Sequence, residues 1–409
     1  MPDSSALVID RTESHQPENV TMNPFKAGHS FASDVAATVA DSVALPTLRR
    51  VVAEHVAAAI ADPRLTRSQR ILLGGSGDSW FAGLCVAPAY RRWTGLPVEA
   101  KTAMELARYE SPLLGPSDLV ISVSNSGSSS RARETVLLAK DRGALTLGVT
   151  GSLTGALAKQ ADLIVHRPVI EEIGLPAHYG RCFLNLAEYL AVLYALYSFG
   201  LALGVQRGRI TAEFQAQQMT RIEAAINAQH AIAARIEPAM AALAEELAAQ
   251  DTIWAIGAGP SRGTAQYCAA KFHEQMPLNG VGGDLEEWAH LEYFLTLKWR
   301  ARSVVMVIAP PGNSLDRARE IVTGITGAGG RAIVVNAGGA VDFVGAHLRV
   351  DLGSEVDEWL SPLVYHLPAQ LLVLHMAARA GIPFLPMRRH DGTWLIAKGI
   401  VRETTQGLN

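Results

Sequence analysis

Residues 71–83 read Ile71-Leu-Leu-Gly-Gly-Ser-Gly-Asp-Ser-Trp-Phe-Ala-Gly83, a short apolar run that breaks into glycines and then into apolar residues at helical spacing. The pattern predicts a strand, a tight loop and a helix. Glycines let backbone N–H groups approach a ligand closely, and the N-terminus of the following helix attracts an anion. Because such turns also occur for purely structural reasons, this stretch alone leaves an anion site and a plain α/β turn as equal alternatives.

The next predicted strand ends in a serine-rich loop. Residues 119–130 read Leu119-Val-Ile-Ser-Val-Ser-Asn-Ser-Gly-Ser-Ser-Ser130, with a helix expected behind them. Because ligands of open α/β sheets bind beyond the carboxyl ends of the strands, a hydroxyl-lined loop is expected beside the glycine loop. The two loops predict a pocket for a neutral sugar that carries one anionic group.

The surrounding sequence alternates between strand and helix patterns, which predicts a parallel sheet covered on both faces. Strands are expected at 70–74, 97–99, 119–123, 145–149 and 162–166, with helices at 79–94, 103–109, 128–142 and 153–159 between them. Helical spacing also covers residues 29–61, with a break at Pro46, and the long region 183–249.

The second half of the chain repeats the first. Gly75-Ser-Gly77 is matched by Gly257-Ala-Gly259, and the segment 131–136 by 317–322. We therefore expect an α/β protein of two tandem, doubly wound parallel-sheet domains with flanking helices. The expected divisions are a disordered or extended segment (1–28), a first anion-binding domain (29–200), a helical linker (201–249), a second, catalytic domain (250–385) and a C-terminal tail that reaches the active site (386–409).

Composition narrows the class of protein. The chain has 409 residues, a formal net charge of −3, and 49% hydrophobic and 18% charged residues, which argues for a globular protein without a nucleic-acid surface. The longest apolar stretch, around residues 183–205, is interrupted by Asn185 and Glu188, so a buried helix is expected rather than a membrane span. Three widely spaced cysteines favour a reducing, cytoplasmic compartment. No cluster has metal-ligand spacing, so no metal or cofactor is expected.

Candidate acid–base residues lie in the second half. Lys271 and Glu274 are three residues apart on a predicted helix, a spacing that equally fits a surface ion pair. The glycine-rich residues 280–283 predict a turn after that helix, and Asp284, with an acidic residue three positions later, predicts the start of another.

Two further candidates follow in the sequence. His290 lies on the helix that Asp284 begins, where a histidine with purely structural contacts is the alternative. Lys398 is a lone lysine among apolar residues near the C-terminus, where a solvated lysine is the alternative.

From about residue 50 to 403, these motifs together resemble the sugar isomerase (SIS) family. The two-domain layout is similar to the isomerase half of glutamine:fructose-6-phosphate amidotransferase and to related amino-sugar-phosphate deaminases and fructosamine-phosphate deglycases. The resemblance implies a phosphate site in the serine loop, comprising Ser124, Asn125, Ser126, Ser128 and Ser129, together with the glycine-loop residues Gly77, Asp78 and Ser79. Asp78 departs from the family pattern, which has a hydroxyl residue there.

The same resemblance assigns roles in the second half. It implies that Glu274 is the enolisation base, that His290 assists ring opening, and that Lys398, in Ile396-Ala-Lys398, ends an active-site loop. Lys271 is expected to set the charge state of Glu274, and Gly259, in the second glycine loop, is expected to bind the substrate. The family builds its site from more than one subunit, so a homodimer or higher homo-oligomer is expected, with His290 acting in the neighbouring chain.

The expected function is that of an enzyme interconverting ketose and aldose forms of an anionic sugar, most simply a 6-phosphate. Because the chain begins Met1-Pro2, without the cysteine nucleophile of a glutaminase domain, no glutaminase activity is expected. Three alternatives remain open: an amino-sugar-phosphate deaminase or fructosamine-phosphate deglycase, an isomerase of a sulfonated sugar, and a regulatory protein that senses a sugar phosphate without turning it over.

Overall fold

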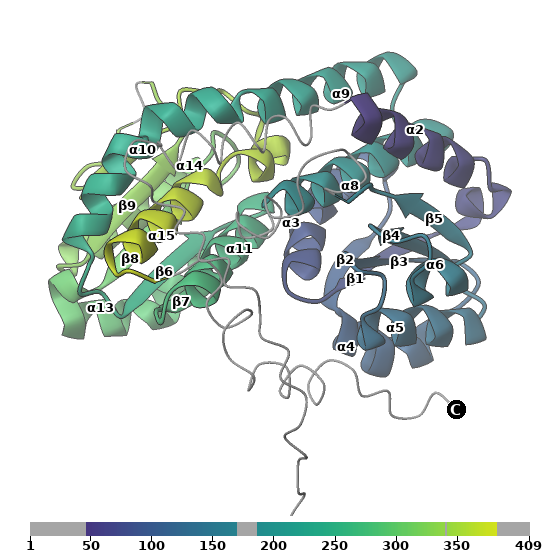
Figure 1. Cartoon of the computed structure of the whole chain (residues 1–409), viewed down its shortest axis with the longest axis horizontal. Helices are drawn as coiled ribbons and strands as arrows, with labels where there is room; N and C mark the ends of the chain where they lie inside the picture. Colours follow the sequence, from purple (N-terminus) through teal and green to yellow (C-terminus); the bar gives the residue numbers. More distant parts are fainter. Residues whose placement is uncertain (1–45, 170–185, 340–341, 383–409) are drawn as a thin grey trace, which may run out of the picture.

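The computed structural model describes residues 46–169, 186–339 and 342–382. Two α/β halves lie side by side, and helices from both halves fill the space between the two sheets (Figure 1). The expected segment 1–28, the first of the two helices expected in 29–61, and the C-terminal tail from residue 386 lie outside the described residues. The second of those helices is α2 (Pro46–Ile60).

The first half holds a five-stranded parallel sheet in the order β2-β1-β3-β4-β5. All five expected strands are confirmed to within three residues at each end. Their runs of valine, leucine and isoleucine are buried, as a sheet covered on both faces requires. The strands are β1 (Arg70–Gly75), β2 (Val98–Thr102), β3 (Asp118–Ser124), β4 (Leu145–Thr150) and β5 (Leu163–His166); the helices between them are α3 (Asp78–Thr94), α4 (Ala103–Glu105), α5 (Ser130–Asp141) and α6 (Ala156–Gln160).

The second half holds another five-stranded parallel sheet, in the order β10-β9-β8-β6-β7. Read from β7 to β10, this is the strand order of the first sheet, so the predicted fold of two doubly wound parallel sheets is confirmed. The elements are β6 (Thr252–Gly257), α11 (Pro260–Gln275), β7 (Asn279–Asp284), α12 (Leu285–Glu287), α13 (Tyr293–Trp299), β8 (Val304–Ile308), α14 (Leu315–Gly327), β9 (Arg331–Asn336), β10 (Leu348–Asp351) and α15 (Leu367–Arg379). Short helical turns η1 (Pro63–Arg67), η2 (Leu106–Glu110), η3 (Ser111–Leu113), η4 (Trp288–Glu292), η5 (Arg300–Arg302) and η6 (Glu358–Leu363) complete the list.

The glycine-rich residues 280–283 are not the predicted turn. They belong to the edge strand β7, which pairs in parallel with β6. A side chain at Gly280 would place its Cβ 2.1 Å from the carbonyl oxygen of Ala269 on α11. The glycines therefore let helix and strand pack with their backbones almost in contact. Sequence reasoning attributed this close approach to a ligand.

The region 183–249 is helical in its described part, as predicted, and forms three helices there. They are α8 (Leu186–Gln206), α9 (Ala212–Asn227) and α10 (Gln229–Glu246), which cross from the first half to the second (Figure 1). Helix α8 is long and apolar enough to span a membrane by length and composition, but 83% of its most apolar window is buried inside the fold. The expectation of a buried helix is confirmed.

One hydrophobic cluster runs through both halves. It takes in β1, β3 and β4 of the first sheet, β6, β8 and β9 of the second, and the apolar faces of α3, α8, α10, α11 and α15. Helices α3 and α11 lie against one another across the junction, where the Cys85 thiol is 3.8 Å from the Thr264 hydroxyl. Burial raises the pKa of the Cys85 thiol to about 12, so this cysteine stays uncharged at neutral pH.

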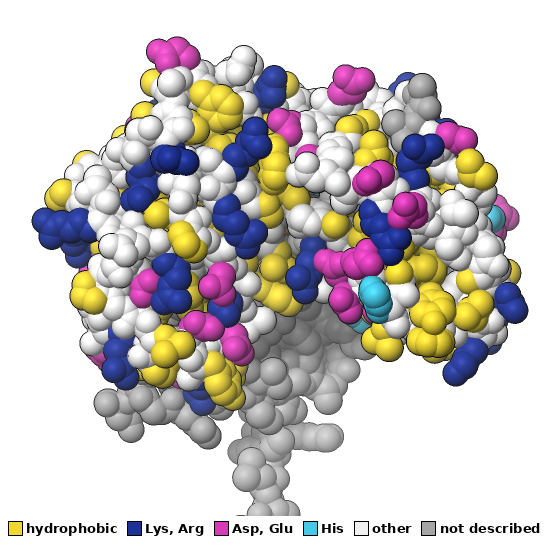
Figure 2. All heavy atoms as spheres, turned by 180° about the vertical axis from the view of Figure 1, so that it is seen from behind, with side chains coloured by type: hydrophobic (Ala, Val, Ile, Leu, Met, Phe, Trp, Pro, Cys, Tyr) yellow, Lys and Arg dark blue, Asp and Glu magenta, His cyan; other side chains and the backbone are white. Residues whose placement is uncertain are grey.

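On the face shown in Figure 2, basic and acidic side chains are interspersed with hydrophobic ones over both halves. This mixture agrees with the small net charge of −3; a nucleic-acid surface gathers basic side chains into a stripe instead.

Candidate functional site

The loop after β1 presents a helix N-terminus at the edge of the first sheet. Gly77 is the N-cap of α3 and has a φ of +57° with a ψ of −131°, a conformation that residues with a Cβ rarely adopt. Gly259 caps α11 in the second half with nearly the same angles. Of the other two predicted residues in the first loop, Ser79 and Asp78 are half-buried. A helix N-terminus of this kind suits an anion, although the Trp80 N–H already donates to the Gly77 carbonyl oxygen at 2.9 Å.

The serine loop lies beside it. β1 and β3 are neighbours, with Gly74 opposite Ser122, so their carboxyl ends meet at the point where the strand order reverses. The hydroxyl oxygens of Ser126 and Ser128 are 2.8 Å apart and exposed, Ser124 is buried at the end of β3, and Ser129 caps α5. The structure thus brings the glycine and serine loops together, as predicted.

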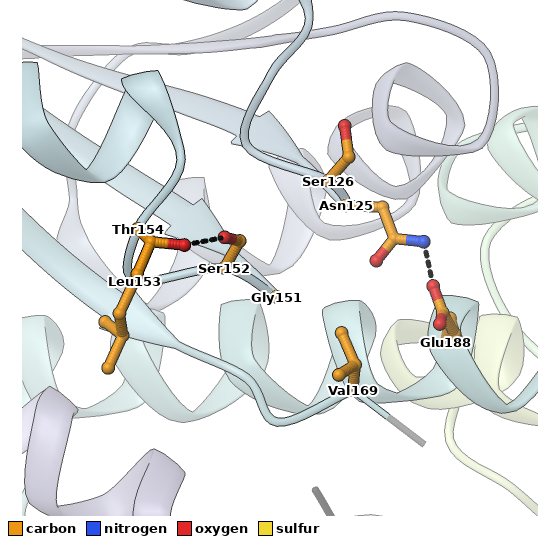
Figure 3. A pocket seen from close by; sticks show the side chains of 8 residues that line it. All are labelled: Asn125, Ser126, Gly151, Ser152, Leu153, Thr154, Val169 and Glu188. Carbon is orange, nitrogen blue, oxygen red and sulfur yellow. Dashed lines mark hydrogen bonds between the residues drawn. The ribbon is translucent and has the colours of Figure 1, made fainter. Parts of the chain in front are cut away.

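A cavity of about 430 Å³ opens beside the serine loop, within the size range of small-molecule sites. Its lining comes from the ends of β3 and β4 and from α8, namely Asn125, Ser126, Gly151, Ser152, Leu153, Thr154, Val169 and Glu188. Figure 3 shows the Asn125 amide pointing at the Glu188 carboxylate, to which it donates a hydrogen bond. The fully buried Arg167 donates to the same oxygen at 3.3 Å.

Sequence reasoning missed part of this cavity. Residues 151–154 follow β4 as the serine loop follows β3, and their hydroxyl groups at the end of a strand are the signal that would have revealed them. Glu188 was noted only as a polar interruption of an apolar helix. Its acidic side chain in the first turn of α8 was the available signal, since Ala187 and Tyr189 on either side of it are buried.

The serine loop supports a direct prediction about anion binding. Changing Ser124 and Ser126 together to alanine removes two hydroxyl donors; a hydrogen bond to a charged group contributes about 1.5–3 kcal/mol. We therefore expect the KM for the anionic substrate to rise by roughly tenfold or more, with the fold unchanged. Steady-state kinetics measure KM, and circular dichroism checks folding. An unchanged KM in the folded double variant would remove this loop from the site.

The helix α11 carries the predicted acid–base pair. Lys271 Nζ donates to Glu274 Oε2 at 2.8 Å and to both carboxylate oxygens of Asp78, at 2.9 and 2.8 Å. Lys271 is fully buried, so the alternative of a surface ion pair is wrong. Burial by itself lowers the pKa of Lys271, but the charges of Asp78 and Glu274 outweigh it, and the pKa is raised above its ordinary value.

Asp78 connects this pair to the glycine loop. It is the first residue of α3, whereas Lys271 and Glu274 lie on α11, so the three side chains join the two halves of the chain. The pairing explains the departure from the family pattern, because a hydroxyl in this position would leave Lys271 with one counter-charge fewer. The role of Asp78 as a substrate ligand stays a prediction.

His290 lies apart from Glu274. It sits in η4 on the surface, where its Nε2 is 3.2 Å from Glu286 Oε1, and Glu286 in turn binds Arg317 at 2.6 Å. Hydrogen bonding to Arg317 lowers the pKa of Glu286, which disfavours it as a base. Asp284 starts the helix as predicted, with its carboxylate accepting from the Glu286 N–H at 2.9 Å. Lys398 lies outside the described residues.

The second half holds a carboxylate of its own where the first half has the serine loop. Glu358 is buried, and its Oε2 accepts from the Asn313 N–H at 3.1 Å, in the loop that follows β8. The loop corresponds by strand order to the serine loop after β3. Among the described residues, no group of three or more histidine, cysteine, aspartate or glutamate side chains is placed to hold a metal ion.

A buried histidine next to Lys271 gives a pH prediction. His366 lies edge-on to the stacked rings of Tyr189 and Tyr267, and burial lowers its pKa to about 3. Below the unfolded value of about 6.5, the unfolded chain binds a proton that the folded chain does not, so stability falls as the pH drops. The loss from this group should reach about 2 kcal/mol at pH 5.

Denaturant unfolding at pH 5 and pH 7 measures that loss. The variant His366→Gln lacks the titrating ring and should lose correspondingly less stability over the same interval. An equal loss in both proteins would show that His366 does not cause it.

The first half of the chain, which holds the glycine and serine loops, matches a known protein family. The family model described as "SIS domain" matches residues 64–198. These residues form a SIS domain. They include the glycine loop, the serine loop and the cavity between β3, β4 and α8, so the predicted anion site lies within the matched region.

Curated relatives extend the match across the second half. The glutamine–fructose-6-phosphate aminotransferase (isomerizing) of Mycolicibacterium smegmatis is 27% identical over 308 residues, which cover 75% of this chain and 45% of the relative. The enzyme of the same name from Zymomonas mobilis is 26% identical over 82% of this chain and 54% of its own length. This chain, with its SIS domain, is thus homologous to the isomerase half of these proteins and spans about half their length.

Solved structures share the fold. The C-terminal domain of glucosamine-fructose-6-phosphate aminotransferase from Francisella tularensis matches 84% of this chain and 96% of its own, with a TM-score of 0.69 and 17% identity. Tagatose-6-phosphate ketose/aldose isomerase from Escherichia coli matches 86% and 92%, with a TM-score of 0.64 and 20% identity. Both structures match well beyond the SIS domain of residues 64–198, so the arrangement of two sheets is shared as well.

Proposed function

We propose that the chain is an enzyme that interconverts ketose and aldose forms of an anionic sugar, most simply a sugar 6-phosphate. The observation that carries the proposal is a pair of contacts made by the buried Lys271. Its ammonium group donates to Glu274 and also to Asp78, the residue that follows Gly77 in the predicted anion-binding loop. An acid–base carboxylate and an anion site in one arrangement are what aldose–ketose isomerisation needs.

The proposed mechanism is a proton transfer through an enediol. The glycine and serine loops hold the anionic group of the open-chain sugar. Glu274 removes a proton from C1 of the ketose and the electrons pass to the C2 carbonyl oxygen, which takes up a proton. Return of the proton to C2, with loss of the proton from the C1 hydroxyl as the C1 carbonyl forms, gives the aldose. A positioned acid–base group of this kind contributes about 10²- to 10⁴-fold to the rate.

The remaining predicted residues have roles in this scheme as proposals. His290 assists opening of the sugar ring by moving a proton between the ring oxygen and the anomeric hydroxyl. Lys398 forms an imine with the open carbonyl or stabilises the enediolate charge. Lys271 is enclosed by two carboxylates and the ring of Tyr267, 4.5 Å away, so it acts on Glu274 and not on the sugar carbonyl.

Incubation with sugar phosphates in deuterated water tests the proposal. With fructose 6-phosphate and other ketose phosphates, NMR should show deuterium entering C1 of the ketose and C2 of the aldose product. A parallel panel of amino-sugar phosphates, fructosamine phosphates and sulfonated ketoses, assayed for ammonia, amine or aldose, distinguishes the alternative reactions. Saturable binding without exchange or turnover of any of these compounds would identify a sensor and contradict the proposal.

We also propose that the active unit is at least a homodimer in which His290 completes the site of the neighbouring chain. His290 is exposed, and exposed apolar side chains follow it on η4 and α13, including Leu291 (66% exposed) and Phe294 (51%). A surface helix with such side chains suits burial against a second copy. Within one chain, His290 pairs with Glu286, in a different cluster from Glu274.

Complementation tests the shared site. A Glu274→Gln chain and a His290→Ala chain should each be inactive alone, whereas mixed dimers should recover part of the activity because one site keeps both residues. Subunit exchange is verified by native mass spectrometry of tagged chains. Mixed dimers that form but stay inactive would show that each chain uses its own His290.

A further inference from the structure

Lys271 is held by carboxylates from both halves of the chain. Asp78 on α3 binds it through both oxygens, at 2.9 and 2.8 Å, and Glu274 on α11 binds it through one, at 2.8 Å. Lys271 is fully buried, while each carboxylate keeps about a quarter of its side chain exposed. Two carboxylates, one from each half of the chain, therefore share one buried ammonium group.

Among the residues that the structure describes, the tyrosine, cysteine and histidine side chains around Lys271 are uncharged at neutral pH. Burial raises the pKa values of Tyr267 and Tyr189 well above the ordinary range, and it raises the pKa of the Cys268 thiol above its ordinary value. Burial lowers the pKa of His366 to about 3. The ammonium group of Lys271 therefore depends on Asp78 and Glu274 for its stabilisation.

This dependence matters when Glu274 acts as a base. Once Glu274 has taken a proton it is neutral, and a buried ammonium without a counter-charge costs several kcal/mol. If Glu274 were the sole partner of Lys271, that cost would oppose the proton transfer. Because Asp78 keeps both oxygens on Lys271, an ion pair persists while Glu274 changes its charge.

We propose that Asp78 is a positioning residue for catalysis, the permanent counter-charge of Lys271 that frees Glu274 to accept and return a proton. The proposal rests on the proposed function. It assigns Asp78 an action through Lys271, in place of the substrate contact that the family pattern implies. It also gives a reason for an acidic residue where the family has a hydroxyl, since an uncharged hydroxyl could not balance the positive charge of Lys271.

The pH profile of Asp78→Asn is the first test. The amide keeps the shape and a hydrogen-bond acceptor but removes the charge, so Glu274 becomes the single counter-charge of Lys271 and holds a proton less readily. The acidic limb of the plot of kcat against pH should move down by about one pH unit, because a charge a few ångströms away shifts the pKa of a carboxyl group by roughly 1–3 units. The maximal kcat of Asp78→Asn should fall at least tenfold, while its KM stays within a few-fold of that of the unchanged protein. Asp78→Glu, which restores the charge, should recover part of the lost kcat.

A stability cycle is the second test and needs no turnover. Asp78→Asn and Glu274→Gln each leave Lys271 one carboxylate, so each should lower Tm by a few degrees. The double variant leaves none, and its Tm should fall clearly more than the sum of the two single losses.

Additive losses of Tm would overturn the shared counter-charge. A raised KM with an unmoved acidic limb would overturn the positioning role and make Asp78 a substrate ligand. More-than-additive losses in a chain that turns over no sugar phosphate would overturn the proposed function alone and leave the charge sharing established.

Discussion

Replacing Glu274 with glutamine is expected to abolish deuterium exchange at C1 and C2 of the sugar, while substrate affinity stays within a few-fold. The substitution keeps the shape of the side chain and one acceptor for Lys271, but it removes the group that takes the proton. A loss of about 10²- to 10⁴-fold is the ordinary contribution of a positioned base. The exchange rate by NMR and the affinity from ligand titration measure the two quantities separately.

Glu287 and Glu286 are the matched controls for this experiment. Both lie on the surface near the start of α12, and Glu286 is already engaged by Arg317 and His290. Glu287→Gln should keep at least half of the exchange rate. Exchange that survives in Glu274→Gln and disappears in Glu287→Gln would mean that the wrong carboxylate has been assigned as the base.

Removing the charge of Lys271 is expected to have the largest effect on stability. Lys271→Met removes the buried ammonium that Asp78 and Glu274 share, and breaking a buried ion pair from one side costs about 3–5 kcal/mol. For a chain of 409 residues, this corresponds to a fall in Tm of roughly 4–6 °C. Differential scanning calorimetry measures the shift.

A surface pair provides the comparison for Lys271. Arg50 and Glu54 form an ion pair one helical turn apart, with side chains about 60% exposed. Arg50→Met should lower the free energy of unfolding by less than about 1 kcal/mol, because exposed ion pairs contribute little to stability. Adding Asp78→Asn and Glu274→Gln to Lys271→Met should recover part of the lost Tm, because the two carboxylates that faced the ammonium are then neutral amides. Equal effects of the Lys271 and Arg50 changes would contradict the role given to burial.

Local sequence patterns were enough to predict the strands and the anion loops. A strand between two glycine- or serine-rich turns is defined by neighbouring residues, and the carboxyl ends of parallel strands necessarily meet at one edge. The sequences of residues 71–77 and 119–130 were therefore enough to place these two segments in the first sheet. The motifs that resemble those of SIS proteins were enough to predict the family.

The errors came from contacts between distant segments. The pattern of Lys271 and Glu274 fits an exposed helix face, and its burial results from α3, which lies almost two hundred residues earlier in the chain. Residues 280–283 look like a turn because glycine breaks local structure, yet their lack of side chains serves contact with α11. The pairing of Glu188 with Asn125 likewise depends on how α8 crosses the first sheet.

The hydrophobic cluster that runs through both halves determines how the chain can be divided. Tyr189 on α8 stacks on Tyr267 of α11, and the Cys85 thiol on α3 lies 3.8 Å from the Thr264 hydroxyl, so this cluster is built from both sides of the junction. A fragment ending at residue 198, at the border of the SIS domain, would expose part of this apolar surface and cut α8 before its end. Although each half also has a smaller apolar cluster of its own, the two halves are therefore expected to unfold in a single cooperative transition.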